Sequence, residues 1–282
     1  MAHTFPKDFS GPVLALIALG EKAARNTRWP DYTALGITSE HVPELIRILG
    51  GLEEFWPEEY VDAPEAYTPI HAWRVLGQLR VEQAIPALIE TIIWNEDGNI
   101  DWIMEEIPEV MGMIGPVSIP PLHEYLLNPN KQTWASVTVA HCLAEVGKQH
   151  PESRTDCVEA LQAGLEHYAD NDETINGFLI SYLADLIAVE AAPLVERAFQ
   201  ADRVDLSIMG DFEEYQIAVG LLKERQTPPP RFSFFEDPQA QWEEEKKSRQ
   251  EDERRQRQQA QKEKKKRKQV KKTRRGRRGK RK

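Results

Sequence analysis

The sequence predicts an all-α protein, built as a right-handed α-solenoid of about five helical hairpins with a charged, partly helical and partly disordered C-terminal tail. Two observations predict the solenoid: apolar residues recur at helical spacing, and one proline-bearing helix motif returns several times along the chain. A third observation sets the tail apart. The balance of charge reverses near residue 240, where an acidic body gives way to a basic arm.

Residues 69–94 contain the hairpin that the rest of the chain repeats. Two apolar stripes follow the i, i+3, i+4, i+7 spacing of a helix face, one made of Ala72, Val75, Leu76 and Leu79 and the other of Ile85, Leu88, Ile89 and Ile92. Gly77 and the polar break at 80–83 leave room for a tight turn between them, and Pro86 suits the first turn of the second helix. A hairpin with two apolar stripes cannot bury both alone, so it requires neighbours.

The motif of the second helix recurs at five places. It reads HVPELI around Pro43, AIPALI around Pro86, SIPPLH around Pro120, CVEALQ around Glu159 and AAPLVE around Pro193. The spacings between these anchors are 43, 34, 39 and 34 residues. Two-helix units of this length are typical of α-solenoids.

A first helix is expected upstream of each anchor. The first should run over residues 13–25, and the later ones should carry the stripes of 103–114, 135–146 and 175–186. Pro108 should kink the third or delay its start. A short capping helix is expected at 211–222, and the prolines at 228–230 should end the folded part.

These expectations divide the chain into three segments: a solenoid over 1–226, a proline and aromatic linker over 227–238, and a charged helix with a basic disordered tail over 239–282. An insertion at 51–68 mixes aromatic residues with six acidic ones. Its Trp56 and Tyr60 either cap the apolar end of the first unit or bind a partner.

The repeats resemble a known class. HAWRVLGQLRVEQAIPALIETI, MGMIGPVSIPPLHEYL and LADLIAVEAAPLVERAF are similar to HEAT-like repeats of the short bacterial kind named after phycobilisome lyases. Residues from about 10 to 225 resemble a family of uncharacterised bacterial HEAT-like proteins. Some relatives end in a cysteine-rich zinc motif of the SEC-C type, whereas no cysteine follows Cys157 here. The resemblance implies a fold and protein binding, and it implies no reaction.

Catalysis, metals and cofactors are not expected. The sequence contains no phosphate-binding glycine loop, GxSxG elbow or HExxH pair. The two cysteines, Cys142 and Cys157, lack metal-ligand spacing and exclude a disulfide framework. His141 next to Cys142 would point about 100° away on a helix. No apolar run reaches the roughly 20 residues that span a bilayer, so we expect no membrane segment and a cytoplasmic location.

An acidic stripe is the candidate docking surface on the body. Asp101, Glu105 and Glu109 lie at i, i+4 and i+8, with Glu106 beside them. The alternatives are a solvated face, a dock for a basic partner, and a metal site. The preceding NEDGNID loop has its glycine in the wrong place for an EF-hand.

The C-terminal arm is the candidate nucleic-acid contact. Residues 1–240 hold 15 Lys and Arg against 39 Asp and Glu, whereas residues 241–282 hold 21 against 7. Such an arm makes phosphate contacts with little sequence readout. The alternatives are a solubilising or localising tail and one that folds back onto the acidic body. The residues expected to contact RNA, the ribosome or DNA are Lys264, Lys265, Lys266, Arg267, Lys268, Lys271, Lys272, Arg274, Arg275, Arg277 and Arg278.

The sequence therefore predicts a non-catalytic scaffold or adaptor. Its solenoid would hold a protein partner while the tail contacts a polyanion. The alternative function is a bilin or chromophore lyase, or another ligand-binding HEAT-like protein, by analogy with the phycobilisome relatives.

Overall fold

The computed structural model describes residues 5–6, 8–26, 28–56 and 63–230, together with 242, 246, 247 and 249. Every regular element in this part is a helix and no strand occurs in it, which confirms the all-α class. None of its helices is both long and apolar enough to cross a membrane. The chain divides into two units, Met1–Glu224 and Arg225–Lys282, and helices α1 to α14 all lie in the first.

Helices alternate along the first unit in a fixed order. A single 3₁₀ turn precedes the second helix of each pair, and four of the five second helices begin at the second residue of the recurring motif. The fourth is an exception, because it begins at Arg154, three residues before its motif starts at Cys157. In the described residues these second helices are α3 (Val42–Leu49), α6 (Ile85–Trp94), α8 (Ile119–Leu126), α10 (Arg154–Glu166) and α12 (Ala192–Gln200). The long first helices of the later pairs are α5 (Thr68–Gln78), α7 (Asp101–Ile114), α9 (Thr133–Gln149) and α11 (Glu173–Asp185).

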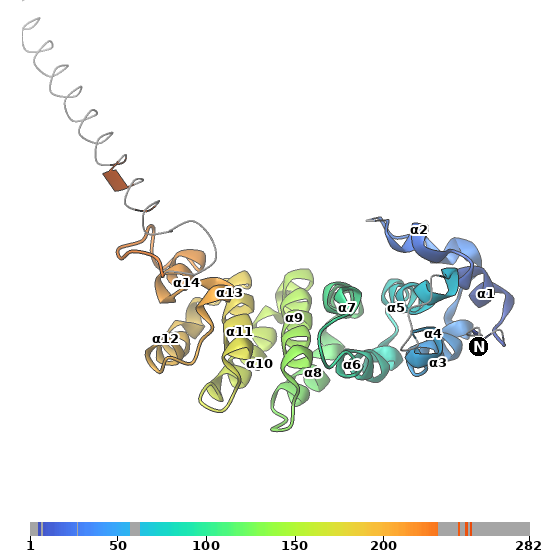
Figure 1. Cartoon of the computed structure of the whole chain (residues 1–282), viewed down its shortest axis with the longest axis horizontal. Coiled ribbons are helices and arrows are strands. Elements are labelled where there is room, and N and C mark those ends of the chain that lie inside the picture. The colour runs from blue at the N-terminus through green and yellow to red at the C-terminus, as the bar shows by residue number, and fades with distance from the viewer. Residues whose placement is uncertain are drawn as a thin grey trace, which may run out of the picture. The chain divides into compact units, whose positions relative to one another are not determined.

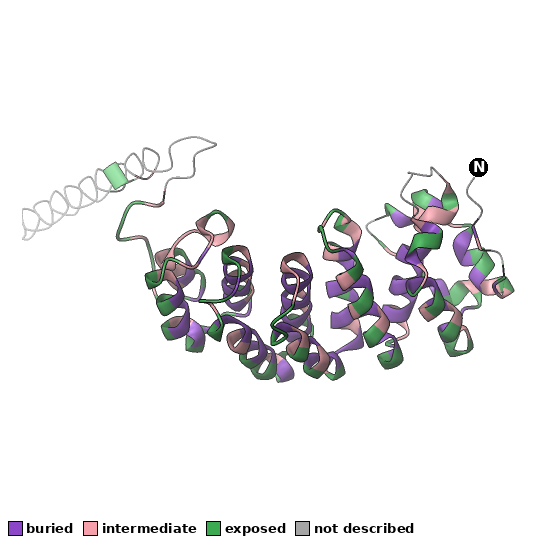
Figure 2. Cartoon of the chain, turned by 60° about the horizontal axis from the view of Figure 1, so that its bottom comes forward, coloured by how far each residue is buried: buried purple, intermediate pink, exposed green. Residues whose placement is uncertain are grey.

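The two kinds of helix form two rows, which Figure 1 shows side by side. In one row α5 packs on α7, α7 on α9, and α9 on α11, while in the other α8 packs on α10 and α10 on α12. Buried residues face the space between the rows and exposed ones face outward (Figure 2). Leu88 has no exposed surface and Glu90 on the same helix is exposed, as the stripe predicts.

The first pair departs from the expected pattern. The helix expected over 13–25 is two short helices, α1 (Gly11–Ile17) and α2 (Gly20–Ala24). Gly20 adopts φ +59°, and a Cβ built on it would lie 3.0 Å from Cβ of Pro64 in the 3₁₀ turn η3 (Pro64–Tyr67). Glycine alone accommodates both that conformation and that approach, so the chain breaks its helix there.

Two further expectations need correction. Gly77 lies inside α5, where a Cβ would come within 3.2 Å of Val110 on α7, so it permits close helix packing and does not form the turn. The turn instead places Arg80 in the left-handed region at φ +52°. Pro108 does not delay its helix, because α7 begins at Asp101 and continues through it.

The aromatic insertion folds partly back onto the core. After α4 (Leu52–Phe55), the Trp56 indole N–H donates to the carbonyl of Ala66 at 2.7 Å. Its ring lies 6.0 Å from that of Trp73 and 5.9 Å from that of Trp94. Trp56 therefore covers the apolar end of the early pairs, which was the first of its two predicted roles. Tyr60 lies outside the described residues.

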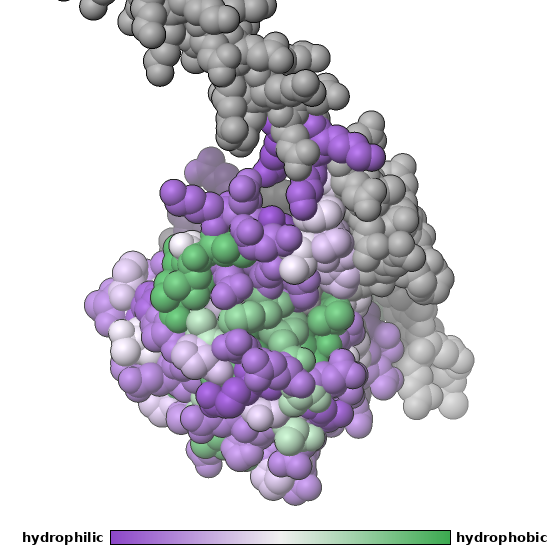
Figure 3. Space-filling model, turned by 90° about the vertical axis from the view of Figure 1, so that its left-hand side faces the viewer, coloured by the Kyte–Doolittle hydropathy of each residue, from purple (hydrophilic) through white to green (hydrophobic). Residues whose placement is uncertain are grey.

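The row ends in two short helices, α13 (Leu206–Met209) and α14 (Phe212–Ala218). Asp211 caps α14 by accepting the Glu214 amide at 3.2 Å. No further pair follows in the described residues, and Ile187, Val189 and Leu221 are 60%, 42% and 48% exposed. Figure 3, which looks onto this end, shows apolar surface gathered there.

Candidate functional site

Helices α7, α9 and α11 run parallel and share one outward face. The His141 ring on α9 reaches Met104 of α7, and further along His150, just after α9, reaches Gly112 near the end of α7. Between α9 and α11 the contacts advance in the same direction, from Trp134–Phe178 through His141–Tyr182 to Lys148–Asp185. Because the residue numbers rise together on neighbouring helices, the three helices run in the same direction, and their outward side chains form bands across them.

An aromatic band crosses α9 and α11. Ring centroids lie 6.4 Å apart for Trp134 and Phe178, 6.0 Å for Phe178 and Tyr182, and 5.0 Å for Tyr182 and His141, the last pair tilted by only 3°. All four side chains are half-buried. Stacked rings that keep one face in solvent offer both apolar area and a negative π surface to a ligand.

His141 is fixed in this band by a proline on the neighbouring helix. Pro108 has no amide hydrogen, so the carbonyl of Met104, four residues earlier, has no helical donor. His141 Nδ1 lies 3.3 Å from that oxygen, which can only accept, so Nδ1 carries the proton. Burial lowers the pKa of His141, partly offset by Glu145. The ring therefore stays neutral near pH 7 and behaves as an aromatic platform.

An acidic band lies beside the aromatic one. It comprises Glu105 and Glu109 on α7, Glu145 on α9 and Asp185 on α11. The ammonium of Lys148 sits between the last two, 3.0 Å from Glu145 and 2.9 Å from Asp185. Burial opposes the charge of Lys148, but the bonds to Asp185 and Glu145 outweigh it and raise its pKa. No described cation pairs with Glu105 or Glu109.

The pKa of Glu109 shows that the neighbouring carboxylates repel one another. Partial burial raises the pKa of its carboxyl group, and the negative charges of Glu106 and Glu145 raise it further. A nearby cation would reverse both effects, because it stabilises the ionised form. We call the aromatic and acidic bands together the docking face.

Three of the four predicted docking residues lie on this outward side. Asp101, Glu105 and Glu109 are exposed on α7, as a stripe at i, i+4 and i+8 should be. The prediction was wrong for Glu106, which does not lie with them. It is 8% exposed, turned by one helical position toward α5, and bonded to Arg74.

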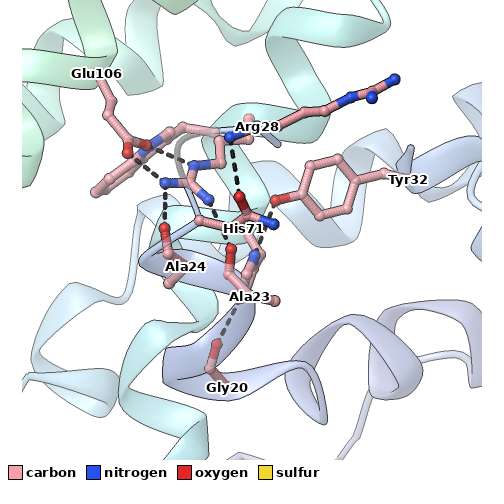
Figure 4. A network of polar contacts seen from close by, with 10 residues as sticks. Gly20, Ala23, Ala24, Arg28, Tyr32, His71 and Glu106 are labelled. Carbon is pink, nitrogen blue, oxygen red and sulfur yellow. Dashed lines mark hydrogen bonds and ion pairs between the residues drawn. The ribbon is translucent and has the colours of Figure 1, made fainter. Parts of the chain in front are cut away.

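The Glu106 carboxylate is held by three donors. Trp73 Nε1 donates to Oε2 at 2.9 Å and Arg74 Nε donates to the same oxygen at 2.7 Å, while Arg74 Nη2 pairs with Oε1. Nη2 also donates to the carbonyl of Ala24 at 2.7 Å. The network, seen in Figure 4, ties α5 and α7 to the end of α2. The Arg74 guanidinium also lies 5.0 Å from the Trp29 ring centroid.

A second buried pair adjoins it. Tyr32 Oη lies 2.9 Å from His71 Nδ1, and His71 Nε2 lies 3.2 Å from the carbonyl of Gly20 (Figure 4). Since a carbonyl only accepts, Nε2 donates and Nδ1 accepts from the tyrosine hydroxyl. Burial lowers the pKa of His71 to about 4 and raises that of Tyr32 to about 12. Both groups are neutral at pH 7 and hold the segment around Gly20 against α5.

The cysteines lie in the core. Cys142 has no exposed surface, and burial raises its thiol pKa. Burial also raises the pKa of Cys157, to about 12. Thiols in this state are poor nucleophiles. Among the described residues no group of three His, Cys, Asp or Glu side chains is placed to hold a metal ion.

The eleven predicted phosphate contacts, Lys264 to Arg278, lie outside the described residues, as do Phe232, Phe234 and Phe235 of the linker.

Residues 29–226 match the family described as "Protein of unknown function (DUF1186)", which is more than half of the chain. The chain belongs to this family. No curated protein and no solved structure matches it. The DUF1186 match begins at Trp29 and includes the whole docking face and the Arg74–Glu106 pair, whereas Ala24 of the same network lies before it.

Sequence reasoning found the acidic side of the docking face and missed the aromatic side. Phe178 and Tyr182 stand at i, i+4 and Trp134, His141 and Glu145 at i, i+7 and i+11, so both sets have the spacing of a helix face. A second stripe opposite the apolar one on α9 and α11 was the available signal.

Proposed function

We propose that this protein is a non-catalytic binding scaffold. Its helix pairs act as HEAT-like repeats of a right-handed α-solenoid, the docking face holds a protein partner, and the basic tail contacts a polyanion. Support for the repeats comes from the recurring order of long helix, 3₁₀ turn and proline-bearing helix.

One observation carries the docking role. In the same row of helices, α5 buries every residue from Thr68 to Gly77, whereas α7, α9 and α11 keep acidic and aromatic side chains partly exposed. Half-exposed aromatic residues beside charges are typical of protein-binding surfaces, because they supply contact area at a small cost in conformational entropy.

The proposed docking role is tested by affinity capture with nuclease added. Wild-type chain is compared with Glu105→Gln/Glu109→Gln and with Glu124→Gln/Glu159→Gln, whose residues are exposed on α8 and α10 of the other row. A partner that binds wild type and the second variant, and not the first, supports the docking face. Equal capture by both variants would reject it.

The polyanion role of the tail rests on its charge alone. If about 6–10 cations engage phosphates, affinity for duplex should fall by roughly 10³ to 10⁵ between about 50 and 200 mM salt. The chain ended at Pro230 should lose this binding and keep its thermal melt. Salt titrations against RNA and DNA of mixed sequence measure both, and binding that ignores salt would contradict the proposal.

A further inference from the structure

One cation of the chain itself, the ammonium group of Lys148, is already bound to carboxylates of the docking face. Lys148 places its ammonium within 3.0 Å of carboxylates from two different helices, Glu145 on α9 and Asp185 on α11. One helix earlier, Glu109 of α7 lies near enough to Glu145 for the negative charge of Glu145 to raise the pKa of Glu109, and Glu105 lies one turn before Glu109 on the same exposed stripe. No described cation pairs with Glu105 or Glu109. The face therefore has carboxylates without a cation between α7 and α9, next to the two carboxylates that Lys148 occupies between α9 and α11.

The spacing of the helices sets the distance between these two places on the face. Packed helices lie about 8–10 Å apart, so equivalent positions on α7, α9 and α11 step by that amount. A segment in the extended polyproline II conformation rises about 3.1 Å per residue and has three residues per turn, so every third side chain points to the same side and three residues span about one step. A segment lying across the helices meets the acidic band with every third side chain.

The aromatic band offers a surface for the residues of such a segment that lie between its cations. Tyr182 and His141 lie one turn before Asp185 and Glu145 on their helices, next to the acidic band. Apolar side chains or the stems of Lys and Arg can cover these rings, and a cation near the ring faces gains a further attraction. Phosphate groups are disfavoured, since Glu105, Glu109, Glu145 and Asp185 face a single Lys148.

We infer that the docking face takes an extended Lys/Arg-containing protein segment whose cations stand three residues apart, with apolar residues between them. One cation enters the place beside Glu105 and Glu109, and the next competes with Lys148 for Glu145 and Asp185. This inference names the partner of the proposed scaffold and rests on that function.

The experiment compares two synthetic peptides of equal length and composition by fluorescence anisotropy with the full chain. One carries cations at i, i+3 and i+6 with Leu and Ala between them, and the other carries the same three cations in a row. The spaced peptide should bind about tenfold more tightly, a difference equivalent to about 1.4 kcal/mol. Equal affinities would overturn the inference.

Variants locate the site. Glu105→Gln/Glu109→Gln should weaken binding of the spaced peptide about tenfold and remove the preference, because the open place loses both carboxylates. The matched control is Glu124→Gln/Glu159→Gln on the opposite row, which removes the same charge and should leave the preference intact. If both variants weaken binding equally, the peptide is held by overall charge and the inference fails.

Lys148→Gln gives the sharpest test, since it removes a charge from the face and should improve binding. With Glu145 and Asp185 released, affinity for the spaced peptide should rise several-fold. Lys22→Gln changes net charge equally at an exposed position on α2 and should have little effect. Unchanged affinity in Lys148→Gln would show that the peptide does not reach α9 and α11.

The experiments distinguish a failure of the proposed cation spacing from a failure of the proposed scaffold function. A partner that is captured by wild type and lost with Glu105→Gln/Glu109→Gln, with no preference between peptides, preserves the scaffold and rejects the spacing. If that variant still binds both the partner and the peptide, the docking role and the cation spacing are both rejected.

Discussion

Two ion pairs join neighbouring long helices, one at each end of the row, and their surroundings differ. Arg74 and Glu106 join α5 to α7 with side chains only 1% and 11% exposed, whereas Lys148 and Asp185 join α9 to α11 at 38% and 45%. The buried pair has its charges satisfied by tryptophan and carbonyl partners and excludes water. The exposed pair can exchange partners with solvent or a ligand. One arrangement of helices thus buries an ion pair at one end and leaves an ion pair exposed at the other.

Removing Glu106 should produce the largest loss of stability. Glu106→Gln leaves the Arg74 charge buried without its counterion, and breaking one side of such a pair costs about 3–5 kcal/mol. Urea denaturation of the full chain measures the change in free energy of unfolding.

Its neighbour provides the control. Glu105→Gln removes the same charge one residue away, at an exposed position, and should cost less than about 0.5 kcal/mol. Equal losses would mean that Glu106 is not buried against Arg74.

The loss of stability from one buried apolar side chain can be compared with the losses expected for the two ion pairs. Leu88→Ala removes a fully buried side chain of α6 and should cost about 2–5 kcal/mol. Glu90→Ala on the exposed side of that helix should cost less than about 0.5 kcal/mol. Similar melting temperatures for the two variants would place the buried face of α6 elsewhere.

The buried end should also respond to acid. Since burial holds the pKa of His71 at about 4 in the folded chain, the unfolded chain, with an ordinary pKa near 6.5, binds the proton first as pH falls. Stability from His71 is complete above about pH 6.5, and about 1.4 kcal/mol per pH unit is lost between there and pH 4. His71→Gln should flatten the stability profile in this window. A slope identical to that of wild type would show that His71 titrates alike in both states.

The exposed pair should matter least to folding. Asp185→Asn removes one partner of Lys148, and pairs this exposed contribute about 0–1 kcal/mol. The small effect should disappear at about 1 M salt, where screening is strong. Thermal melts at low and high salt measure it, and a loss comparable with that of Glu106→Gln would remove the distinction between the two ends.

Periodicity predicted the all-α class and the buried helix faces, because the spacing of apolar residues reports which side of a helix is buried. Leu88 and its stripe needed only the 3.6-residue repeat, and the prolines marked where second helices begin. The Arg74–Glu106 pair could not be found this way, since its partners lie 32 residues apart on different helices and no local pattern links them. The break at Gly20 was missed for the same reason, because it depends on the approach of Pro64.

The candidate site was half predictable. Charge at i, i+4 and i+8 marked Asp101, Glu105 and Glu109, but Glu106 was included only because it adjoins Glu105 in the sequence, and its side chain turns toward Arg74 on α5. Whether a carboxylate faces water or an arginine depends on the neighbouring helix.

Pro108 gives the row a source of order that does not depend on apolar contact. It lacks the amide that would bond the carbonyl of Met104, four residues earlier, and the His141 ring of the next pair reaches that oxygen at 3.3 Å. His150 makes a similar contact at 2.9 Å with the carbonyl of Gly112, in the last turn of α7, where helix carbonyls have no later amide to bond. The missing donor at residue 108 fixes where the His141 ring binds, because the interior of a helix with all its amides offers no vacant acceptor. Restoring the amide at residue 108 would give Met104 a donor within its own helix and free the His141 ring to turn away from Tyr182. The flatness of the aromatic band on α9 and α11 is thereby set by a residue on α7.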